Sequence, residues 1–182
     1  MNLRFRHINP DDLPMILNWR TMPEVADYMY TDFEPKIEIQ QKWYDDINQD
    51  DTRRDWLINV DGEDVGLLSI VKIDDLNKRC EWAYYLASPS VRGKGIGKSV
   101  EMNVLDYVFQ TLNLNKLCCE VLGYNELVVK IHEKYGSRVE GTRRRHIFKK
   151  GEFHDIVEMG ILREDWEKSI RGNFEYIKAE ID

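Results

Sequence analysis

The sequence predicts an α/β fold, a mixed and mostly antiparallel sheet flanked by helices, in a single domain that spans residues 1–182. A chain of 182 residues suits one globular domain. No Ser/Gly-rich linker, low-complexity run or internal repeat divides it. Short apolar segments alternate with amphipathic helical patterns, and helices inserted between the strands of a mixed sheet form an α/β sandwich.

The first third of the chain predicts one strand and two helices. Residues 3–8 alternate between two faces, as in a strand. The Asn-Pro-Asp-Asp turn that follows starts a helix over residues 13–19, which Pro23 ends. A second helical pattern covers residues 38–47, with apolar side chains four residues apart.

Three strands come next in the chain. Residues 55–60 and 65–73 form a hairpin around the turn Asp61-Gly62. Residues 80–86 are aromatic and nearly continuous in their apolar character, which is typical of a strand buried on both faces.

The last segments extend the same alternation to the end of the chain. In order, they are a helix over 97–112, a strand over 116–122, a helix over 126–135, strands over 137–149 and 152–162, and a final helix over 163–181. We therefore expect about seven strands.

Composition and charge exclude several function classes. Lys and Arg total 26 against 33 Asp and Glu, so the net charge is −7, which disfavours nucleic acid as a partner. The three cysteines, Cys80, Cys118 and Cys119, form no CxxC motif, so we expect reduced thiols and no metal. No signal-peptide core or run of 18 apolar residues is present, so we expect a cytoplasmic protein without a membrane partner. A homodimer remains open.

A glycine-rich turn, PSVRGKGIGKS, separates the aromatic strand from the apolar helix. Its glycines allow positive φ and close approach of a ligand. Successive amide groups at a helix N-terminus form an anion-binding nest, and interleaved basic side chains add charge. We expect the turn to hold a pyrophosphate through Arg92, Gly93, Lys94, Gly95, Ile96, Gly97, Lys98 and Ser99.

The glycine spacing separates three phosphate-binding patterns. A dinucleotide fingerprint needs GxGxxG after the first strand of a parallel unit, and this turn follows an antiparallel hairpin. A Walker-type loop needs GxxxxGK[ST], and the turn is one residue short of it. The pattern [Q/R]xxGx[G/A] is matched by Arg92, Gly95 and Gly97. A glycine-rich turn without a ligand is the remaining alternative.

The turn and the order of strands resemble motif A and the overall fold of the GNAT superfamily of N-acetyltransferases, and the resemblance spans essentially the whole chain. It implies acetyl-CoA as co-substrate, splayed fourth and fifth strands, and coenzyme contacts from Tyr85, Leu86 and Ala87 on the strand before the turn. It also places Asn125, at the start of the next helix, beside the coenzyme.

Transfer of an acetyl group to an amine needs a proton acceptor and an acid for the departing thiolate. Glu120 is the expected base because its strand borders the splayed cleft, although an ion-paired surface carboxylate fits the same pattern. Ser69 is expected to position the amine or a water, unless its hydroxyl is simply packed in the strand. Glu81 is a weaker alternative base.

The acid is expected from the segment Ile-His-Glu-Lys-Tyr-Gly-Ser. Many members of the superfamily carry a Tyr in a FYEKxGF-like motif, and His132 stands at that position here. Its near-neutral titration suits a proton donor, but a packing role beside the coenzyme is the alternative. Tyr135 is a substitute acid.

An aromatic and Met-lined set with one Arg in the first third favours a nucleobase plus phosphate as part of the acceptor, although the same residues suit a packed two-helix cap. The segment WR-xx-PEV-xx-YMYT resembles the subgroup that acetylates UDP-linked 4-amino-4,6-dideoxy sugars in pseudaminic acid biosynthesis. By that resemblance the acceptor contacts are Arg20, Met29, Tyr30, Trp43 and Tyr85.

Two other functions remain. A ribosomal-protein or peptide N-terminal acetyltransferase would use acidic residues toward a basic substrate; those residues are Asp32, Glu34, Asp45 and Asp46. A non-catalytic acetyl-CoA sensor would keep the glycine-rich turn and lose the base.

Overall fold

The computed structural model describes residues 1–31 and 34–182. Within them one mixed sheet has eight strands in the order β6-β7-β5-β4-β3-β2-β1-β8. The strands are β1 Leu3–His7, β2 Arg54–Val60, β3 Glu63–Asp74, β4 Arg79–Leu86, β5 Lys116–Leu122, β6 Arg138–Lys149, β7 Glu152–Leu162 and β8 Ala179–Ile181. The pairs β1–β8 and β4–β5 are parallel and the other described pairs are antiparallel, which confirms the predicted fold class.

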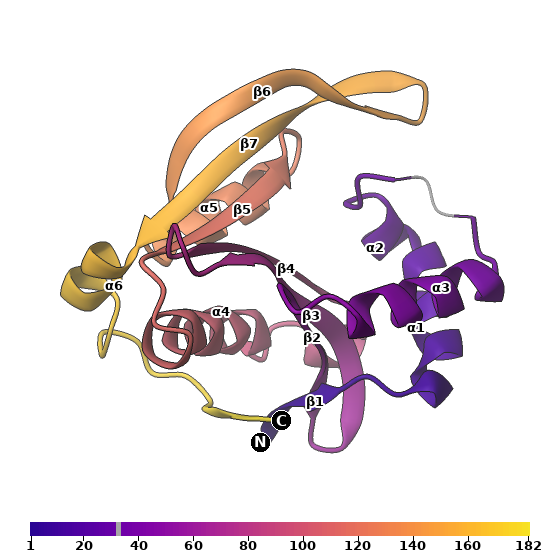
Figure 1. Ribbon diagram of the computed structural model, residues 1–182, viewed down its shortest axis with the longest axis horizontal. Helices are drawn as coiled ribbons and strands as arrows, with labels where there is room; N and C mark the ends of the chain where they lie inside the picture. Colours follow the sequence, from indigo (N-terminus) through magenta and orange to yellow (C-terminus); the bar gives the residue numbers. More distant parts are fainter. Residues whose placement is uncertain (32–33) are drawn as a thin grey trace.

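The first three helices lie together and the fourth lies apart from them. Helices α1–α3 gather at one end of the sheet, and α4 lies under the sheet in the view of Figure 1. The helices are α1 Leu13–Thr21, α2 Pro23–Ala26, α3 Ile37–Asn48, α4 Ile96–Asp106, α5 Glu126–Lys134 and α6 Arg163–Ser169. No helix in the described ranges is long and apolar enough to cross a membrane.

Two hydrophobic cores lie on opposite faces of the sheet. On β2, Trp56 and Ile58 belong to the main core, which contains the apolar face of α4. Leu57, between them, belongs to the second core, which contains Leu13 and Ile16 of α1. Because neighbouring residues of a strand point to opposite faces, α1 and α4 cover opposite faces of the sheet.

The sheet opens between β4 and β5. The two strands pair only where Arg79–Glu81 of β4 meet Lys116–Cys118 of β5. Beyond these residues β4 keeps its other neighbour, β3, and β5 keeps β7. This is the splay that the resemblance implied. It also corrects the expectation that β4 is buried on both faces: Ala83 is exposed, and Tyr84 to Leu86 are half-buried, where the strands part.

The C-terminal segment corrects a second expectation. The helix predicted over 163–181 ends at Ser169 as α6, and the chain continues to β8, the eighth strand, which pairs with β1. The side chain of Asn103 on α4 holds this segment: its amide donates to the carbonyl of Ile177 (2.8 Å) and its oxygen accepts from the N–H of Ala179 (2.9 Å). These contacts join residues more than 70 positions apart, so the local sequence does not reveal them.

The β6–β7 hairpin arches across the molecule toward α2 (Figure 1). At its tip the Lys149 ammonium donates to the carbonyl of Ala26 (3.0 Å), and Lys150 forms an ion pair with Asp27 (2.5 Å). The hairpin therefore connects the two ends of the sheet across the gap between β4 and β5.

Candidate active site

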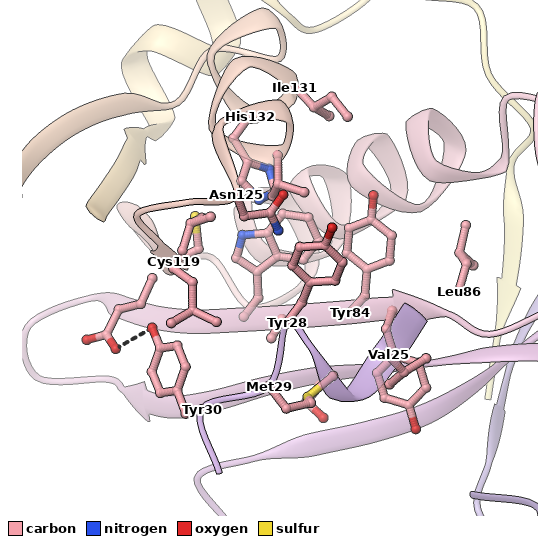
Figure 2. A pocket seen from close by; sticks show the side chains of 18 of the residues that line it. Val25, Tyr28, Met29, Tyr30, Tyr84, Leu86, Cys119, Asn125, Ile131 and His132 are labelled. Atoms are coloured by element: carbon pink, nitrogen blue, oxygen red, sulfur yellow. Dashed lines mark hydrogen bonds between the residues drawn. The ribbon is translucent and has the colours of Figure 1, made fainter. Parts of the chain in front are cut away.

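The gap between β4 and β5 contains a cavity of about 640 Å³ (Figure 2). Side chains of β4 reach it on both faces of the sheet. The ring of Trp82 packs against His132 of α5 (5.4 Å between centroids), whereas the ring of Tyr85 packs against Trp19 of α1 (6.2 Å). The cavity thus has a coenzyme face, toward α4 and α5, and an acceptor face, toward α1 and α2.

The glycine-rich turn leads into α4 next to the coenzyme face. Gly93 and Gly95 have φ of +74° and +73°, and a Cβ at either position would meet nothing within 4 Å. Within the described residues, the N–H groups of Ile96, Gly97 and Lys98 have no acceptor, as usual for a first helical turn. These amides, with the exposed side chains of the turn, suit an anion.

Gly97, at the end of this turn, lies close to a side chain that lines the cavity. A Cβ at Gly97 would lie 3.2 Å from the hydroxyl of Tyr84, a side chain that lines the cavity. Leu86 and Tyr85 line it from β4, and Asn125, at the start of α5, lines it from the other side. An extended ligand that starts at the glycine-rich turn and runs along β4 would therefore reach the centre of the gap.

Two of the residues expected to hold the coenzyme have other partners. The Ser99 hydroxyl is buried; it donates to the carbonyl of Gly95 (3.2 Å) and accepts from the N–H of Ile177 (3.2 Å). The Ala87 N–H donates to the carbonyl of Val65 (2.7 Å), and Ala87 does not line the cavity. The Ser99 hydroxyl and the Ala87 N–H are therefore engaged within the protein, and the expected coenzyme contacts of these two residues would have to use other atoms.

Glu120 lies on the acceptor face. It accepts a hydrogen bond from the Tyr30 hydroxyl (3.1 Å) and forms an ion pair with Arg143 (3.0 Å). Burial, and then the adjacent carboxylate, raise the pKa of Tyr30 far above its ordinary value, so the phenol remains a donor to Glu120. The carboxylate is ion-paired and also lines the cavity, so its role as the base stays a prediction.

Ser69 and Glu81 also line the acceptor face. The Ser69 hydroxyl donates to Asp55 (2.6 Å), whose carboxylate forms an ion pair with Arg53 (2.6 Å). Its lone pairs are left to accept a hydrogen bond from a substrate. Glu81 is held by Lys72 (2.8 Å).

Of the two expected acids, His132 lines the cavity and Tyr135 does not. The ring of Tyr135 packs against Phe174 (5.4 Å between centroids). His132 is 6% exposed, and its Nδ1 lies 3.2 Å from Oε2 of Glu101 on α4. Tyr135 is therefore excluded as the acid by its position.

Glu101 was missed by the sequence analysis. It is 2% exposed and lines the coenzyme face, where it also accepts a hydrogen bond from Tyr84 (3.5 Å). The available signal was a carboxylate in line with the apolar residues Val104 and Val108, on the buried side of α4.

Cys119 also lines the cavity. Burial raises the pKa of the Cys119 thiol to about 12, so the group stays protonated at neutral pH. A protonated thiol is a poor nucleophile. This favours direct attack by the amine over an acetyl-cysteine intermediate.

On the acceptor face, Arg20, Met29 and Tyr30 line the cavity, and so does Tyr85. The Tyr85 hydroxyl oxygen is buried without a hydrogen-bond partner in the described part of the chain. Trp43 lies elsewhere: it packs against the second core through α3, so the expectation that it contacts the acceptor is wrong.

A β-bulge in β6 lies next to this face. Arg143 pairs with Ile156 and Ile147 pairs with His154, so three residues of β6 oppose one of β7. The extra residues are Arg144, Arg145 and His146, all exposed. Arg145 has a φ of +50°, and its N–H donates to Asp155 (2.7 Å). The cationic bulge, defined as residues 144–146, begins one residue after the partner of Glu120.

Known acetyltransferases are similar to this chain in sequence. Spermidine N(1)-acetyltransferase of Escherichia coli K12 is 28% identical over 166 residues, which cover 91% of this chain and 88% of that protein. Acetyltransferase PseH of Campylobacter jejuni is 27% identical over 133 residues, 71% of this chain and 79% of that protein.

The fold is shared with solved structures. Spermidine N-acetyltransferase from Vibrio cholerae, in complex with CoA and spermine, superposes with a TM-score of 0.83 at 24% identity, over 91% of this chain and 98% of that one. The model of the acetyltransferase (GNAT) domain matches residues 2–138, well over half of the chain. The chain therefore belongs to the GNAT acetyltransferases and is an N-acetyltransferase that uses acetyl-CoA.

Proposed function

We propose that the acceptor is the primary amine of a UDP-linked 4-amino-4,6-dideoxy sugar. The observation that carries the proposal is the cationic bulge beside Glu120. Arginine side chains bind phosphate oxygens with charge-assisted and often bidentate hydrogen bonds. A diphosphate at the bulge would leave the attached sugar at the acceptor face, next to the cavity.

The charges of the acceptor face allow an anionic substrate. Glu81 is paired with Lys72, whereas Arg143 is shared between Glu120 and Glu158. Glu24 and Arg20 add one charge of each sign to the lining. The face therefore keeps a small negative excess, and the cationic bulge outside it supplies the positive field for an anionic substrate.

The apolar part of the wall also suits a nucleotide sugar. Tyr28, Met29 and Tyr30 line one side of the cavity (Figure 2), where aromatic and thioether groups pack well against a ring. The partnerless Tyr85 hydroxyl offers a hydrogen bond to a sugar or phosphate oxygen. This agrees with the resemblance of residues 19–31 to the UDP-sugar subgroup.

The chemical roles follow from the two faces. The coenzyme supplies the acetyl thioester. Ser69 accepts a hydrogen bond from the amine, and Glu120 takes the proton that the amine loses, directly or through a water. On the coenzyme face, His132 donates a proton to the sulfur as the carbon–sulfur bond breaks. Because Cys119 is protonated, the amine attacks the acetyl carbon itself.

The test is thiol release from acetyl-CoA by the purified protein with three acceptors: a UDP-4-amino-4,6-dideoxyhexose, spermidine and an N-terminal alanine peptide. We expect turnover of the UDP-sugar and competitive inhibition by UDP. The double variant Arg144→Ala/Arg145→Ala should raise KM for the sugar roughly 100-fold, since two charge-assisted contacts contribute about 3 kcal/mol.

Arg138→Ala, on the same strand but outside the bulge, is the matched control and should leave KM unchanged for the UDP-sugar and for acetyl-CoA. Turnover of spermidine without turnover of the UDP-sugar, or no inhibition by UDP, would overturn the proposal.

A polyamine is the second candidate acceptor. Four carboxylates line the cavity, those of Glu24, Glu81, Glu101 and Glu120, and such a lining attracts a polycation. Relatives named as spermidine acetyltransferases match over most of the chain. Loss of spermidine turnover in Glu24→Gln, with an unchanged KM for acetyl-CoA, would support this candidate.

The acidic residues proposed to attract a basic protein substrate give little support to a peptide acceptor. Glu34 pairs with Lys36 (2.6 Å), and Asp46 pairs with Lys42 (2.7 Å). Asp45 accepts from Gln41 (3.0 Å). Asp32 lies outside the described residues.

A further inference from the structure

Glu101 is a buried carboxylate to which the proposed reaction gives no role. It lies on α4 between the buried residues Val100 and Met102 and is 2% exposed. Burying a charge in such surroundings is costly unless a partner compensates it. Among the described residues its partners are His132 and Tyr84.

We infer that Glu101 is the positioning residue for His132, holding Nδ1 so that Nε2 carries the proton that is delivered to the departing sulfur. The inference rests on the acid role of His132 in the proposed function. A carboxylate accepts hydrogen bonds, so Nδ1 must carry a hydrogen toward Glu101. The other ring nitrogen, Nε2, has no partner in the described ranges and is left for the reaction.

Two contacts fix the orientation of the imidazole ring. The Nδ1–Oε2 distance is 3.2 Å, and the ring meets Trp82 edge-on at 61° with 5.4 Å between centroids. In Figure 2 His132 projects from α5 toward the cavity. Contacts from α4 and β4 hold the ring, so the protein orients it without help from the bound coenzyme.

Glu101 is the charged group that faces the imidazole. From β4 comes the Tyr84 phenol, from β5 the Cys119 thiol and from α5 the Tyr135 phenol. Burial, followed by the negative charge of Glu101, raises the pKa of Tyr84 and of Cys119, the latter to about 12. Tyr84 and Cys119 are both neutral near pH 7, so Glu101 is the group among these that accepts a hydrogen bond from Nδ1.

The proton balance is complete without another reactant. The amine nitrogen forms its bond to the acetyl carbon and loses one proton to Glu120 or water. The electrons of the carbon–sulfur bond pass to sulfur, which takes the Nε2 proton. Glu120 then releases its proton to solvent and His132 regains one, so the net change is an amide and a free thiol.

The first test is Glu101→Gln, which keeps the volume and an acceptor oxygen but removes the charge. We expect kcat to fall roughly 30-fold at pH 8, with KM for acetyl-CoA changed less than about threefold. Glu133→Gln, an exposed carboxylate on α5, is the matched control and should leave both kcat and KM unchanged.

A double-mutant cycle separates positioning from a structural role. A phenol donates its proton without a tautomer to be fixed, so Glu101→Gln should have little effect on kcat in a His132→Tyr background. An equal loss of kcat in both backgrounds would overturn the inference. These assays use whichever amine the enzyme turns over, so they remain valid if spermidine replaces the sugar.

A spectroscopic measurement is independent of turnover. After Nε2 has given up its proton, the neutral ring keeps its hydrogen on Nδ1, so the ¹⁵N spectrum of the neutral His132 imidazole should show the Nδ1–H tautomer in the native chain and lose it in Glu101→Leu. The Nε2–H tautomer in the native chain would refute the inference. A normal kcat in His132→Ala would instead remove the acid role itself, which distinguishes failure of the proposed function from failure of the positioning role.

Discussion

The glycine-rich turn gives the sharpest test of coenzyme binding through the substitution Gly95→Asp. Gly95 precedes the first residue of α4 and has a φ of +73°. A Cβ there meets nothing within 4 Å, so the substitution does not disturb packing. It places a carboxylate beside the N–H groups of Ile96, Gly97 and Lys98, where we expect the pyrophosphate.

The size of the effect follows from two contributions. A residue with a Cβ at positive φ costs about 1 kcal/mol of folding stability, and Asp tolerates this region better than most residues. Repulsion between the new carboxylate and one phosphate charge is about 2.8 kcal/mol at a separation of about 6 Å and an effective dielectric constant of about 20. The second contribution acts on binding and corresponds to roughly a 100-fold increase in Kd.

The assay is calorimetric titration with acetyl-CoA, repeated at low and high salt. Gly95→Asn has nearly the same shape without the charge and should bind within about fivefold of the native chain. Gly62→Asp makes the same change at another open, positive-φ turn, between β2 and β3, and controls for strain. Native-like binding by Gly95→Asp, or an equal loss in Gly95→Asn, would refute the electrostatic reasoning.

Four further outcomes are expected. His132→Ala should lower kcat about 100-fold while the Kd for acetyl-CoA changes little, because the acid acts only as the thiolate leaves; an equal change in both would indicate a packing role. Cys119→Ser should retain acetyl transfer at pH 7, and a loss of activity would point to a covalent intermediate. The pKa of the Cys119 thiol rises from 9.0 to about 12 on folding, so the folded chain keeps a proton that the unfolded chain releases, and stability should fall as pH rises from 9 to 12; denaturation of Cys119→Ser should show a shallower fall. Gly66→Ala should lower Tm by roughly 10 °C, since the new Cβ would lie 2.1 Å from the backbone oxygen of Tyr85, a contact that forces β3 and β4 apart; a native Tm would contradict it.

Much of the fold was predictable because its signals are local. The strand over Lys116–Leu122 and the strand over Glu152–Leu162 begin and end as predicted. Hydrophobic periodicity, glycine turns and prolines act within a few residues of where they stand. The strand β8 could not be predicted in this way, because three residues become a strand only when β1 and Asn103 hold them.

In the candidate site, too, local features could be predicted and contacts between distant residues could not. The glycine-rich turn and the position of His132 follow from spacing along the chain. Hydrogen bonds between distant residues do not follow from that spacing. The Ser99 hydroxyl accepts from the N–H of Ile177, and the N–H of Ala87 donates to the carbonyl of Val65. Trp43 faces the second core, because the rotation of α3 against α1 is set by packing between helices.

The fold class and the family of N-acetyltransferases could be predicted from residue types at short, fixed separations, and anion binding at the glycine-rich turn stays a prediction of the same kind. Tertiary structure alone decided which side chains meet in the gap between β4 and β5. Glu101 and His132 are 31 positions apart, and Glu120 and Tyr30 are 90 apart. Such pairs form only when the sheet brings distant segments together, because a hydrogen bond needs its donor and acceptor atoms in direct contact.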